Sequence, residues 1–286
     1  MGVSASRLAA QSLRVLPRKG LSRMVGRLAD LELPKGVVRQ AVRTFARIYD
    51  IDVSEADAPA GGYRSLDAFF TRRLRPGSRP LAGDDRVLVS PADGLLADAG
   101  PVDAGCTLRI KGRLYDVPEL LGASDDAARF EGGTFAVIYL APPDYHRVHA
   151  PATGPVALVR HIPGTLYPVN SIGTAHVPSV FARNERVAVV QRTEHFGDVA
   201  TILVGAIGVG RIGLSFDDVV TNVGRAAGTR VYGDDAPRLE RGQELGTFHL
   251  GSTVIVFVSK DAPVTLVRQN DERLRVGEAL ARRGAR

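Results

Sequence analysis

The chain has 286 residues, 44% of them hydrophobic, so it can bury a full core as one domain or as one domain with an appendage. Its single cysteine, Cys106, excludes an internal disulfide framework and suits a reducing compartment. The longest apolar run, residues 199–210, is shorter than the roughly 20 residues of a membrane-spanning helix, and the first residues contain no apolar stretch of the secretory-signal kind.

The positive charge is concentrated at the N-terminus. Residues 1–50 contain ten Lys and Arg against three Asp and Glu, a net of +7, whereas the whole chain carries +6. Apolar residues recur at helical spacing in two stretches, with Pro34 and Gly36 between them: Leu21, Met24, Val25, Leu28 and Leu31, then Val38, Val42, Phe45 and Ile48. We therefore expect residues 1–60 to form basic amphipathic helices.

Basic amphipathic helices of this kind have several uses. They lie in membrane interfaces, attracted by anionic lipid, or they pack as ordinary surface helices on the core of their own protein. Nucleic-acid binding is disfavoured, because the segment has few aromatic residues, Phe45 and Tyr49, and no nucleic-acid motif. The pattern alone leaves the first two uses open.

Beyond residue 60 the pattern changes to short β-rich runs separated by Gly, Pro and Asp. This punctuation favours mainly antiparallel strands. The charged tail, residues 272–286, is expected to be helical or frayed. We predict an α+β fold, with N-terminal amphipathic helices on a predominantly antiparallel β domain that spans residues 61–286 and holds the candidate catalytic residues. The expected strands are 134–141, 155–160, 186–192, 199–207, 252–258 and 264–268.

Two motifs in this domain carry candidate catalytic side chains. The turn-forming segment S-P-A-D-G at 90–94 displays the carboxylate of Asp93. The segment P-P-D-Y-H-R-V-H-A-P at 142–151 contains His146 and His149, which face opposite ways in an extended chain. A zinc site is the rival interpretation, but Cys106 is the only cysteine and no third ligand of fixed spacing is present. The other histidines stand singly and are interpreted as surface or core residues: His161, His176, His195 and His249.

A third motif, L-G-S-T at 250–253, stands directly before the apolar run 254–258. Gly251 has no Cβ, so another group can approach its carbonyl closely, and the Ser252 hydroxyl can reach back to that carbonyl. The flanking residues differ from the G-x-S-x-G of α/β-hydrolases. A plain turn at the start of a strand is the alternative, so four residues alone leave the role of Ser252 open.

These motifs occur together in one known family. S-P-A-D-G, D-Y-H-R-V-H-A-P and L-G-S-T, in this order, resemble phosphatidylserine decarboxylase, and the resemblance covers about residues 15 to 260. Further matching segments are F-F-T-R-R-L-R-P at 69–76, K-G-R-L-Y at 111–115 and F-A-R-N-E-R at 181–186. The resemblance implies an enzyme that converts phosphatidylserine to phosphatidylethanolamine. It would use a Schiff base with a pyruvoyl group made from its own serine, without pyridoxal phosphate or a metal.

The resemblance also implies roles for individual residues. Asp93 would orient His149, His149 would be the base, and Ser252 would be the nucleophile that attacks the Gly251 carbonyl. Cleavage between residues 251 and 252 would give a large chain, 1–251, and a small chain, 252–286, which begins with the pyruvoyl group and stays bound to the large one. His146 would donate a proton during decarboxylation.

A phospholipid substrate favours the membrane interpretation of residues 1–60. The expected partners are phosphatidylserine and an anionic membrane surface, with a peripheral location on the cytoplasmic side of the cell membrane and no nucleic acid. The alternative function is an Asp-His-Ser serine hydrolase of lipid or ester substrates, which would remain one chain. Four cationic residues are candidates for contacting the lipid phosphate, with a solvated surface role as the alternative for each: Arg72, Arg75, Lys111 and Arg183.

Overall fold

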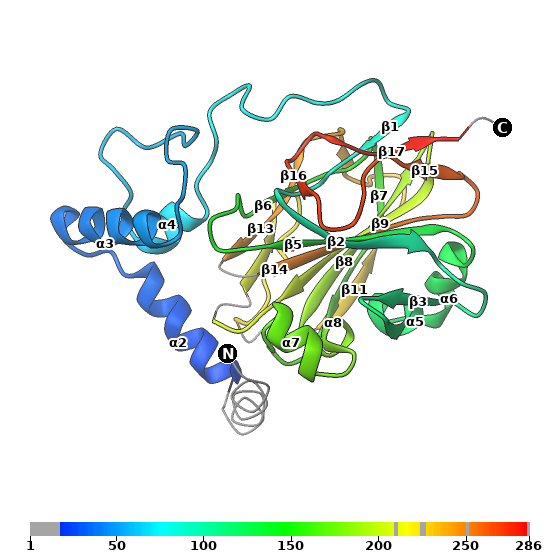
Figure 1. The fold of residues 1–286 in the computed structure, drawn as a ribbon, viewed down its shortest axis with the longest axis horizontal. Coiled ribbons are helices and arrows are strands. Elements are labelled where there is room, and N and C mark those ends of the chain that lie inside the picture. The colour runs from blue at the N-terminus through cyan, green and yellow to red at the C-terminus, as the bar shows by residue number, and fades with distance from the viewer. Residues whose placement is uncertain (1–17, 209–210, 224–226, 250–251, 285–286) are drawn as a thin grey trace.

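The computed structural model describes residues 18–208, 211–223, 227–249 and 252–284, so the predicted cleavage residue Gly251 lies outside the described residues. Within these described residues, three helices near the N-terminal end stand beside a body made mostly of β-sheet (Figure 1). The break between the first two helices falls at Pro34, as expected. A proline disfavours helical backbone in the residue before it, and α3 begins directly after Pro34. The predicted pair of helices is confirmed. The helices are α2 (Arg18–Asp30), α3 (Lys35–Ile48) and the short α4 (Leu66–Phe70).

The body is organised around one large antiparallel sheet of nine strands. Its centre is β14, which pairs with β9 on one side and β5 on the other. The strands in spatial order are β11 (Gly228–Val231), β7 (Gly154–Ile162), β8 (Arg186–Thr193), β9 (Gly197–Gly205), β14 (Ser252–Val258), β5 (Thr134–Leu140), β2 (Gly94–Pro101) and β16 (Arg273–Leu274), with β12 (Arg238–Leu239) beside β7.

Smaller sheets and short helices cover this sheet. One three-stranded sheet is β10 (Arg211–Leu214), β13 (Glu244–His249) and β6 (Arg147–His149), and another is β1 (Val87–Val89), β17 (Ala279–Arg283) and β15 (Val264–Leu266). β3 (Thr107–Ile110) and β4 (Arg113–Asp116) form a hairpin. The remaining helices are α5 (Val117–Leu121), α6 (Ser124–Ala127), η1 (Ala128–Phe130), α7 (Ser171–His176) and α8 (Val180–Arg183). The predicted α+β class is therefore confirmed.

The prediction for the charged tail was wrong. Residues 273–274 form β16 and residues 279–283 form β17, which pairs with both β1 and β15. Leu280 and Ala281 are fully buried in this pairing. A five-residue strand between charged neighbours carries little periodic signal, and its conformation is decided by the strands beside it.

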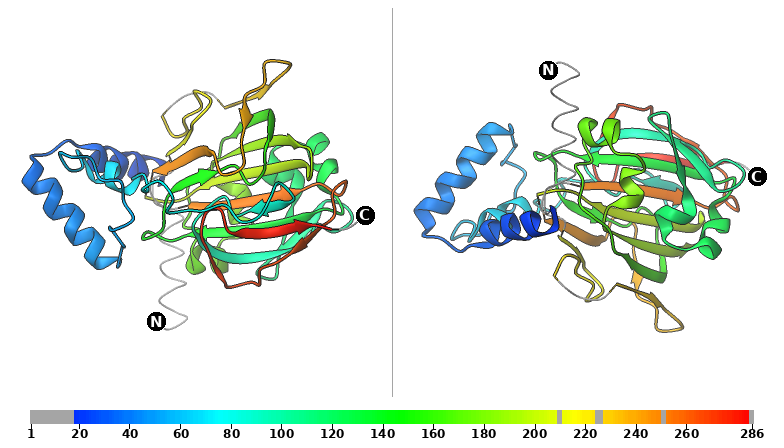
Figure 2. Two further views of the ribbon diagram at one scale, coloured as in Figure 1. Left: turned by 90° about the horizontal axis from the view of Figure 1, so that it is seen from above. Right: turned by 90° about the horizontal axis from the view of Figure 1, so that it is seen from below.

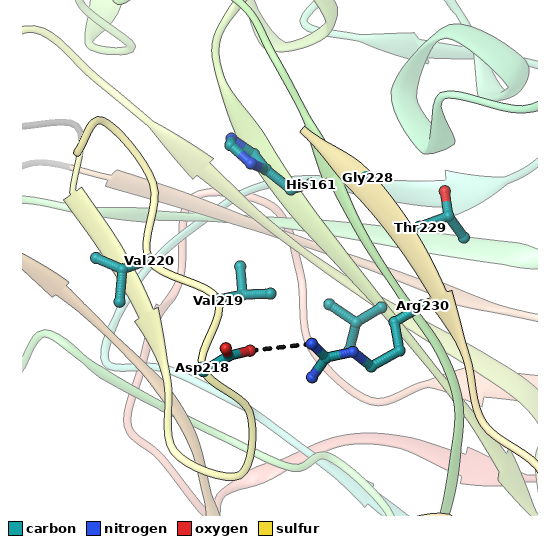
Figure 3. Close-up of a pocket in the computed structure, with 8 residues that line it drawn as sticks. His161, Asp218, Val219, Val220, Gly228, Thr229 and Arg230 are labelled. Carbon is teal, nitrogen blue, oxygen red and sulfur yellow. Dashed lines mark hydrogen bonds and ion pairs between the residues drawn. The ribbon is translucent and has the colours of Figure 1, made fainter. Parts of the chain in front are cut away.

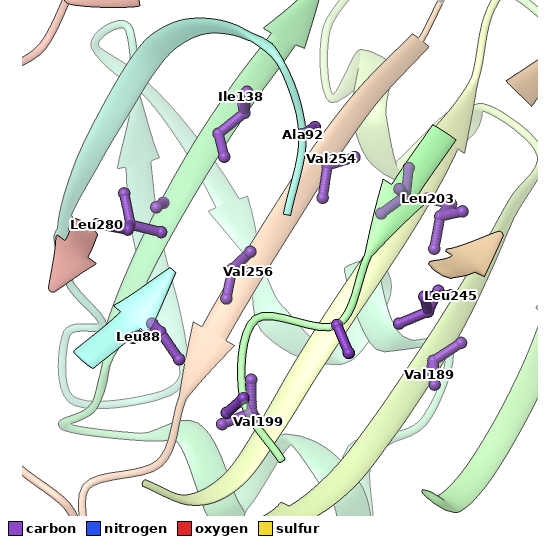
Figure 4. Close-up of a cluster of buried hydrophobic side chains, with 14 of the residues drawn as sticks. Leu88, Ala92, Ile138, Val189, Val199, Leu203, Leu245, Val254, Val256 and Leu280 are labelled. Atoms are coloured by element: carbon purple, nitrogen blue, oxygen red, sulfur yellow. The ribbon is translucent and has the colours of Figure 1, made fainter. Parts of the chain in front are cut away.

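The strand β14 is buried along its whole length, which explains its unbroken apolar sequence. One face of β14 presents Val254 and Val256 to a core that also contains Leu245 and Leu203 (Figure 4). The other face presents Phe257, whose ring centroid lies 5.8 Å from that of Phe130 in η1. With both faces and both edges occupied, β14 holds its first residue, Ser252, in a defined position.

The N-terminal helices project from one end of the β body (Figures 1 and 2). Phe45 of α3 packs on Phe69 and Phe70 of α4, with ring centroids 6.4 and 6.2 Å apart. Met24 and Leu28 of α2 remain more than half exposed, at 53% and 59%. No helix within the described ranges is both long and apolar enough to cross a membrane.

Candidate active site

Ser252 is the first residue of β14 and is completely buried. It pairs with Leu140 of β5 on one side and with Gly205 of β9 on the other. Its Oγ has no hydrogen-bond partner in the parts of the chain that the structure describes. A buried hydroxyl without a partner lowers the stability of the fold, which is typical of a residue kept for a chemical role.

Asp93 lies at the same end of the large sheet as Ser252. Leu95 of β2 pairs with Tyr139 of β5, so Gly94 is level with Leu140 and, one strand further, with Ser252. Two strand spacings separate the backbones of Gly94 and Ser252, roughly 10 Å. A Cβ at Gly94 would lie 2.4 Å from the Tyr139 carbonyl oxygen, which explains why glycine follows Asp93 in the motif.

The Asp93 carboxylate is held by partners other than a histidine. Arg79 Nε donates to both of its oxygens, at 3.0 and 3.1 Å, and Arg79 Nη2 donates to Oδ2 at 2.5 Å. The backbone N–H of Val276 donates to Oδ1 at 2.8 Å. Both oxygens of the buried Asp93 carboxyl group are therefore hydrogen-bonded, and one partner is a guanidinium.

His149 is connected to the Asp93 loop through its backbone. Its N–H donates to the Pro91 carbonyl at 2.8 Å, while its ring Nδ1 lies 2.8 Å from the Gly242 carbonyl oxygen and Nε2 lies 3.2 Å from the Tyr145 hydroxyl. A carbonyl accepts only, so Nδ1 carries the proton and Nε2 is the unprotonated nitrogen. Neither ring nitrogen contacts the Asp93 carboxylate, so the structure brings the two residues together without the expected side-chain hydrogen bond.

Burial lowers the pKa of the His149 imidazole below its ordinary value, and the bond to Gly242 opposes this shift only in part. Burial also raises the pKa of Tyr145 to about 12. The Tyr145 phenol therefore stays protonated and donates to Nε2 of His149. Near neutral pH His149 is therefore uncharged, and the lone pair of its Nε2 accepts a hydrogen bond from the Tyr145 hydroxyl.

His146, like Ser252, has no exposed surface. Its Nδ1 lies 2.8 Å from the Asp144 carbonyl oxygen, and its ring centroid lies 4.0 Å from that of Phe70. Its Nε2 is buried and has no hydrogen-bond partner in the described parts of the chain. Burial lowers the pKa of His146 to about 3, so this nitrogen is an unprotonated acceptor near neutral pH.

The two histidines point to opposite sides of the extended segment, as predicted. The His146 carbonyl accepts from the Phe248 N–H, and His146 shares the inward side with Val148, which is fully buried in the core. His149 lies on the other side, where Arg147 pairs with Glu244 at 2.6 Å. His146 and Ser252 are both fully buried, whereas His149 is half-buried.

The sequence interpretation missed several residues of this region. Arg79, which binds Asp93, and Tyr145, which binds His149, were not singled out. Tyr145 stands inside the D-Y-H-R-V-H motif. His249, interpreted as a surface or core residue although it stands close to the predicted cleavage point, contacts both oxygens of Asp67 at 2.9 Å and Arg211 Nη2 at 2.7 Å.

Two cavities open beside these residues. One, of about 540 Å³, is lined by Asp93, Tyr145, Arg79 and Arg72 among others. The second, of about 450 Å³, is lined by Tyr63, Arg72 and Arg147, and Arg72 thus borders both.

A third cavity, of about 250 Å³, lies away from the predicted site residues, between His161 and the segments 218–220 and 228–230 (Figure 3). His161 Nε2 lies 2.9 Å from Glu185 Oε1, and both side chains are buried. The interpretation of His161 as a core histidine agrees with this pairing.

The chain is similar to known proteins over most of its length. Residues 66–282 match the family model described as phosphatidylserine decarboxylase. Proteins named phosphatidylserine decarboxylase proenzyme are similar: the one from Brevibacillus brevis is 39% identical over 274 residues, covering 94% of this chain and 96% of that protein. Those from Shewanella baltica and Shewanella loihica are 42% and 44% identical, covering 93% and 87% of this chain and 94% and 88% of their own lengths. The chain therefore belongs to the phosphatidylserine decarboxylase family.

Proposed function

We propose that this chain is made as a proenzyme, cleaves itself between Gly251 and Ser252, and then decarboxylates phosphatidylserine to phosphatidylethanolamine. Family membership supports the reaction. The observation that carries the site is the buried, unpartnered hydroxyl of Ser252 at the start of the central strand. Its partner on the neighbouring strand, Gly205, has no side chain.

In the proposed maturation, Ser252 Oγ attacks the Gly251 carbonyl and the peptide bond becomes an ester. Removal of the Ser252 α-proton then expels the Gly251 carboxylate and leaves dehydroalanine at position 252. Addition of water releases ammonia and leaves a pyruvoyl group. That carbonyl supplies an electron sink for the substrate carbon that loses carbon dioxide.

His149 is the proposed base of the maturation step. Its Nε2 carries the lone pair, and its lowered pKa keeps that nitrogen unprotonated at neutral pH. The Tyr145 hydroxyl has to leave Nε2 before the nitrogen can take a proton from Ser252. Asp93 supports His149 through the 90–94 loop, whose Pro91 carbonyl accepts the His149 N–H, and through its negative charge.

His146 is the proposed proton-transfer group of the decarboxylation step. Because its Nε2 is unprotonated near neutral pH, it has to receive a proton before it can give one to the carbon that has lost carbon dioxide. Solvent is the proposed source of that proton, because replacing a carboxylate by hydrogen on the same carbon consumes one proton overall. His146 would thus act first as a base and then as an acid.

The two chains are proposed to stay associated after cleavage. The small chain, 252–286, contains β14, which is hydrogen-bonded on both edges and buried on both faces. It also contributes β15 and β17 to a sheet with β1, and β16 to an edge of the large sheet. Backbone pairing and apolar burial along four strands hold the small chain without a covalent link.

Residues 1–60 are proposed to be a membrane-contacting segment, and residues 61–286 the catalytic domain. α2 exposes Met24 and Leu28, and Leu31 directly after it is also exposed, beside Arg23 and Arg27, an arrangement suited to an interface with anionic lipid. The proposed location is peripheral, on the cytoplasmic side of the cell membrane.

The test combines intact mass with product analysis on one sample. Purified protein is expected to contain two chains, the smaller one of 35 residues with a blocked N-terminus, and to release carbon dioxide from phosphatidylserine. Ser252→Ala is the control, which should stay as one chain and release none. A serine hydrolase would instead remain one chain and cleave esters, and a readable N-terminal serine on the small chain would contradict pyruvoyl formation.

A further inference from the structure

Arg72 is a buried cation with unused hydrogen-bond donors. It is only 5% exposed, and its Nη2 donates to the Pro143 carbonyl at 3.1 Å. Its Nε and Nη1 are buried and have no hydrogen-bond partner in the described parts of the chain. A guanidinium keeps its charge at any physiological pH, and leaving it buried without an anion is expensive.

Other buried or half-buried arginines near this point have carboxylate partners. Arg79 binds Asp93 at 2.5 Å, and Arg147 binds Glu244 at 2.6 Å. Asp93, whose charge also acts on Arg72, is already bonded to Arg79 and to Val276. The contact that Arg72 makes on its remaining side is with the face of Phe69, 5.2 Å from the ring centroid.

The cavity of about 450 Å³ beside Arg72 has a cationic wall. Its charged lining consists of one acid, Asp57, and four arginines, Arg64, Arg72, Arg73 and Arg147. The Tyr63 hydroxyl, also in its lining, is buried and has no hydrogen-bond partner within the described residues. Three buried donor atoms without partners, on two side chains of one cationic cavity, are suited to an anionic ligand with several oxygens.

This cavity adjoins the proposed reaction site. Pro143, which binds Arg72, is three residues before His146, and Phe70, two residues before Arg72, stacks on the His146 ring at 4.0 Å. Arg72 also lines the neighbouring cavity that contains Asp93 and Tyr145. An anion bound to Arg72 would therefore lie beside the residues proposed for proton transfer.

We propose that Arg72, together with the Tyr63 hydroxyl, binds the phosphodiester of the phospholipid headgroup in this cavity, an inference that rests on the proposed function. The headgroup of phosphatidylserine offers two anions, the phosphodiester and the carboxylate. A guanidinium on the carboxylate would stabilise the charge that must disappear as carbon dioxide leaves, and would slow the reaction. The phosphodiester keeps its charge throughout, so binding it holds substrate, transition state and product equally.

The other three arginine and lysine candidates for the phosphate do not share these features. Arg75 and Arg183 are exposed, and Arg183 lies over the Tyr167 ring at 5.3 Å. Lys111 is exposed and paired with Asp271 at 2.8 Å. Arg72 is the member of this group whose donors are buried and unused.

The test compares Arg72→Met with Arg75→Met, a matched change at an exposed arginine three residues further along. With soluble dihexanoyl phosphatidylserine, Arg72→Met should raise KM about 10- to 100-fold and change kcat little, because uniform binding is lost. Self-cleavage on a gel should be unchanged, and Arg72→Lys should recover part of the loss. Arg75→Met should match the wild type in all three measurements.

Two soluble ligands separate the possible anions. Glycerophosphoethanolamine has the phosphodiester without the carboxylate, and serine has the carboxylate without the phosphodiester. Arg72→Met should weaken binding of glycerophosphoethanolamine about 10- to 100-fold and leave serine unaffected. The reverse result would assign Arg72 to the carboxylate and overturn the proposal.

Tyr63→Phe gives a second test if Arg72→Met does not fold. It removes one hydroxyl and should weaken glycerophosphoethanolamine binding about 3- to 10-fold, with self-cleavage intact. Unchanged affinity in this variant, or an unchanged KM in a folded Arg72→Met, would refute the phosphodiester site alone. A wild-type protein that releases no carbon dioxide from phosphatidylserine would instead refute the proposed function.

Discussion

Asp67 and His249, 182 residues apart in the chain, are in direct contact: both Asp67 carboxylate oxygens lie 2.9 Å from His249 Nδ1. Arg211 Nη2 joins them, 2.7 Å from His249 Nδ1 and 3.2 Å from Asp67 Oδ2, and the same guanidinium bonds Asp30 of α2 at 2.7 and 2.9 Å. Helices α2 and α4 are thereby attached to the end of β13, two residues before Gly251.

This contact predicts that Asp67→Ala impairs both stability and maturation. Loss of a nearly buried charged hydrogen-bond partner should lower the free energy of unfolding by about 1–3 kcal/mol, measured with urea in a Ser252→Ala background that keeps one chain. Cleavage of Asp67→Ala alone, followed on a gel, should be slower, because β13 loses an anchor. The control is Asp52→Ala, an exposed carboxylate that accepts from Ser54 N–H. Normal cleavage in Asp67→Ala would show that the anchor is irrelevant to maturation.

Three substitutions test the proposed maturation residues. Ser252→Ala should not cleave at all, and His149→Ala should slow cleavage by roughly 10²–10⁴-fold, the range for loss of one general base. Asp93→Asn should be the mildest, because Asp93 supports His149 without bonding to its ring. A time course of precursor loss on a gel gives all three rates. If His149→Ala cleaves normally, another residue is the base.

His146→Ala should separate maturation from catalysis. The buried His146 ring bonds the Asp144 carbonyl, whereas the His149 ring bonds Gly242 and Tyr145, so the variant should still give two chains and a pyruvoyl group. Decarboxylation should fall by roughly 10²–10⁴-fold, as for one acid–base group. Gel analysis and carbon dioxide release are measured on the same sample. An uncleaved variant would assign His146 to maturation, and a fully active one would leave it without a catalytic role.

The buried imidazole of His146 also predicts how stability depends on pH. Its pKa is about 3 in the folded chain and about 6.5 when unfolded, so below pH 6.5 the unfolded chain binds a proton that the folded chain does not. Stability should therefore fall as pH decreases from about 6.5 towards 3, by about 1.4 kcal/mol per pH unit for this one group. Urea unfolding of Ser252→Ala at several pH values measures the slope, and adding His146→Gln should reduce it by that amount. An unchanged slope would mean that His146 titrates normally.

The exposed apolar face of α2 predicts membrane binding. Leu28→Glu should weaken co-sedimentation with phosphatidylserine-containing vesicles, because it puts a negative charge on the apolar surface that faces anionic lipid. Leu114→Glu is the matched control, since Leu114 of β4 is similarly exposed, at 53% against 59% for Leu28. Equal losses in the two variants would argue against a specific role for α2.

Much of the fold was predictable because the signals are local. The spacing from Leu21 to Leu31 and from Val38 to Ile48 predicted α2 and α3, with Pro34 between them. The apolar runs predicted six strands within a few residues of their observed bounds, including β14 at 252–258. The motifs around Asp93, His146, His149 and Ser252 predicted the family, because the order of short motifs is itself part of the sequence.

Contacts between distant segments were decided only by the tertiary structure. The bonding of Asp93 to Arg79 and Val276, and of His149 to Gly242 and Tyr145, depends on which loops meet at one end of the sheet. The residues of β17 become a strand only because β1 and β15 lie on either side. The sequence offered Arg72 as one of four candidates for the lipid phosphate, and burial, which arises when residues far apart in the chain pack together, is what sets it apart from the other three.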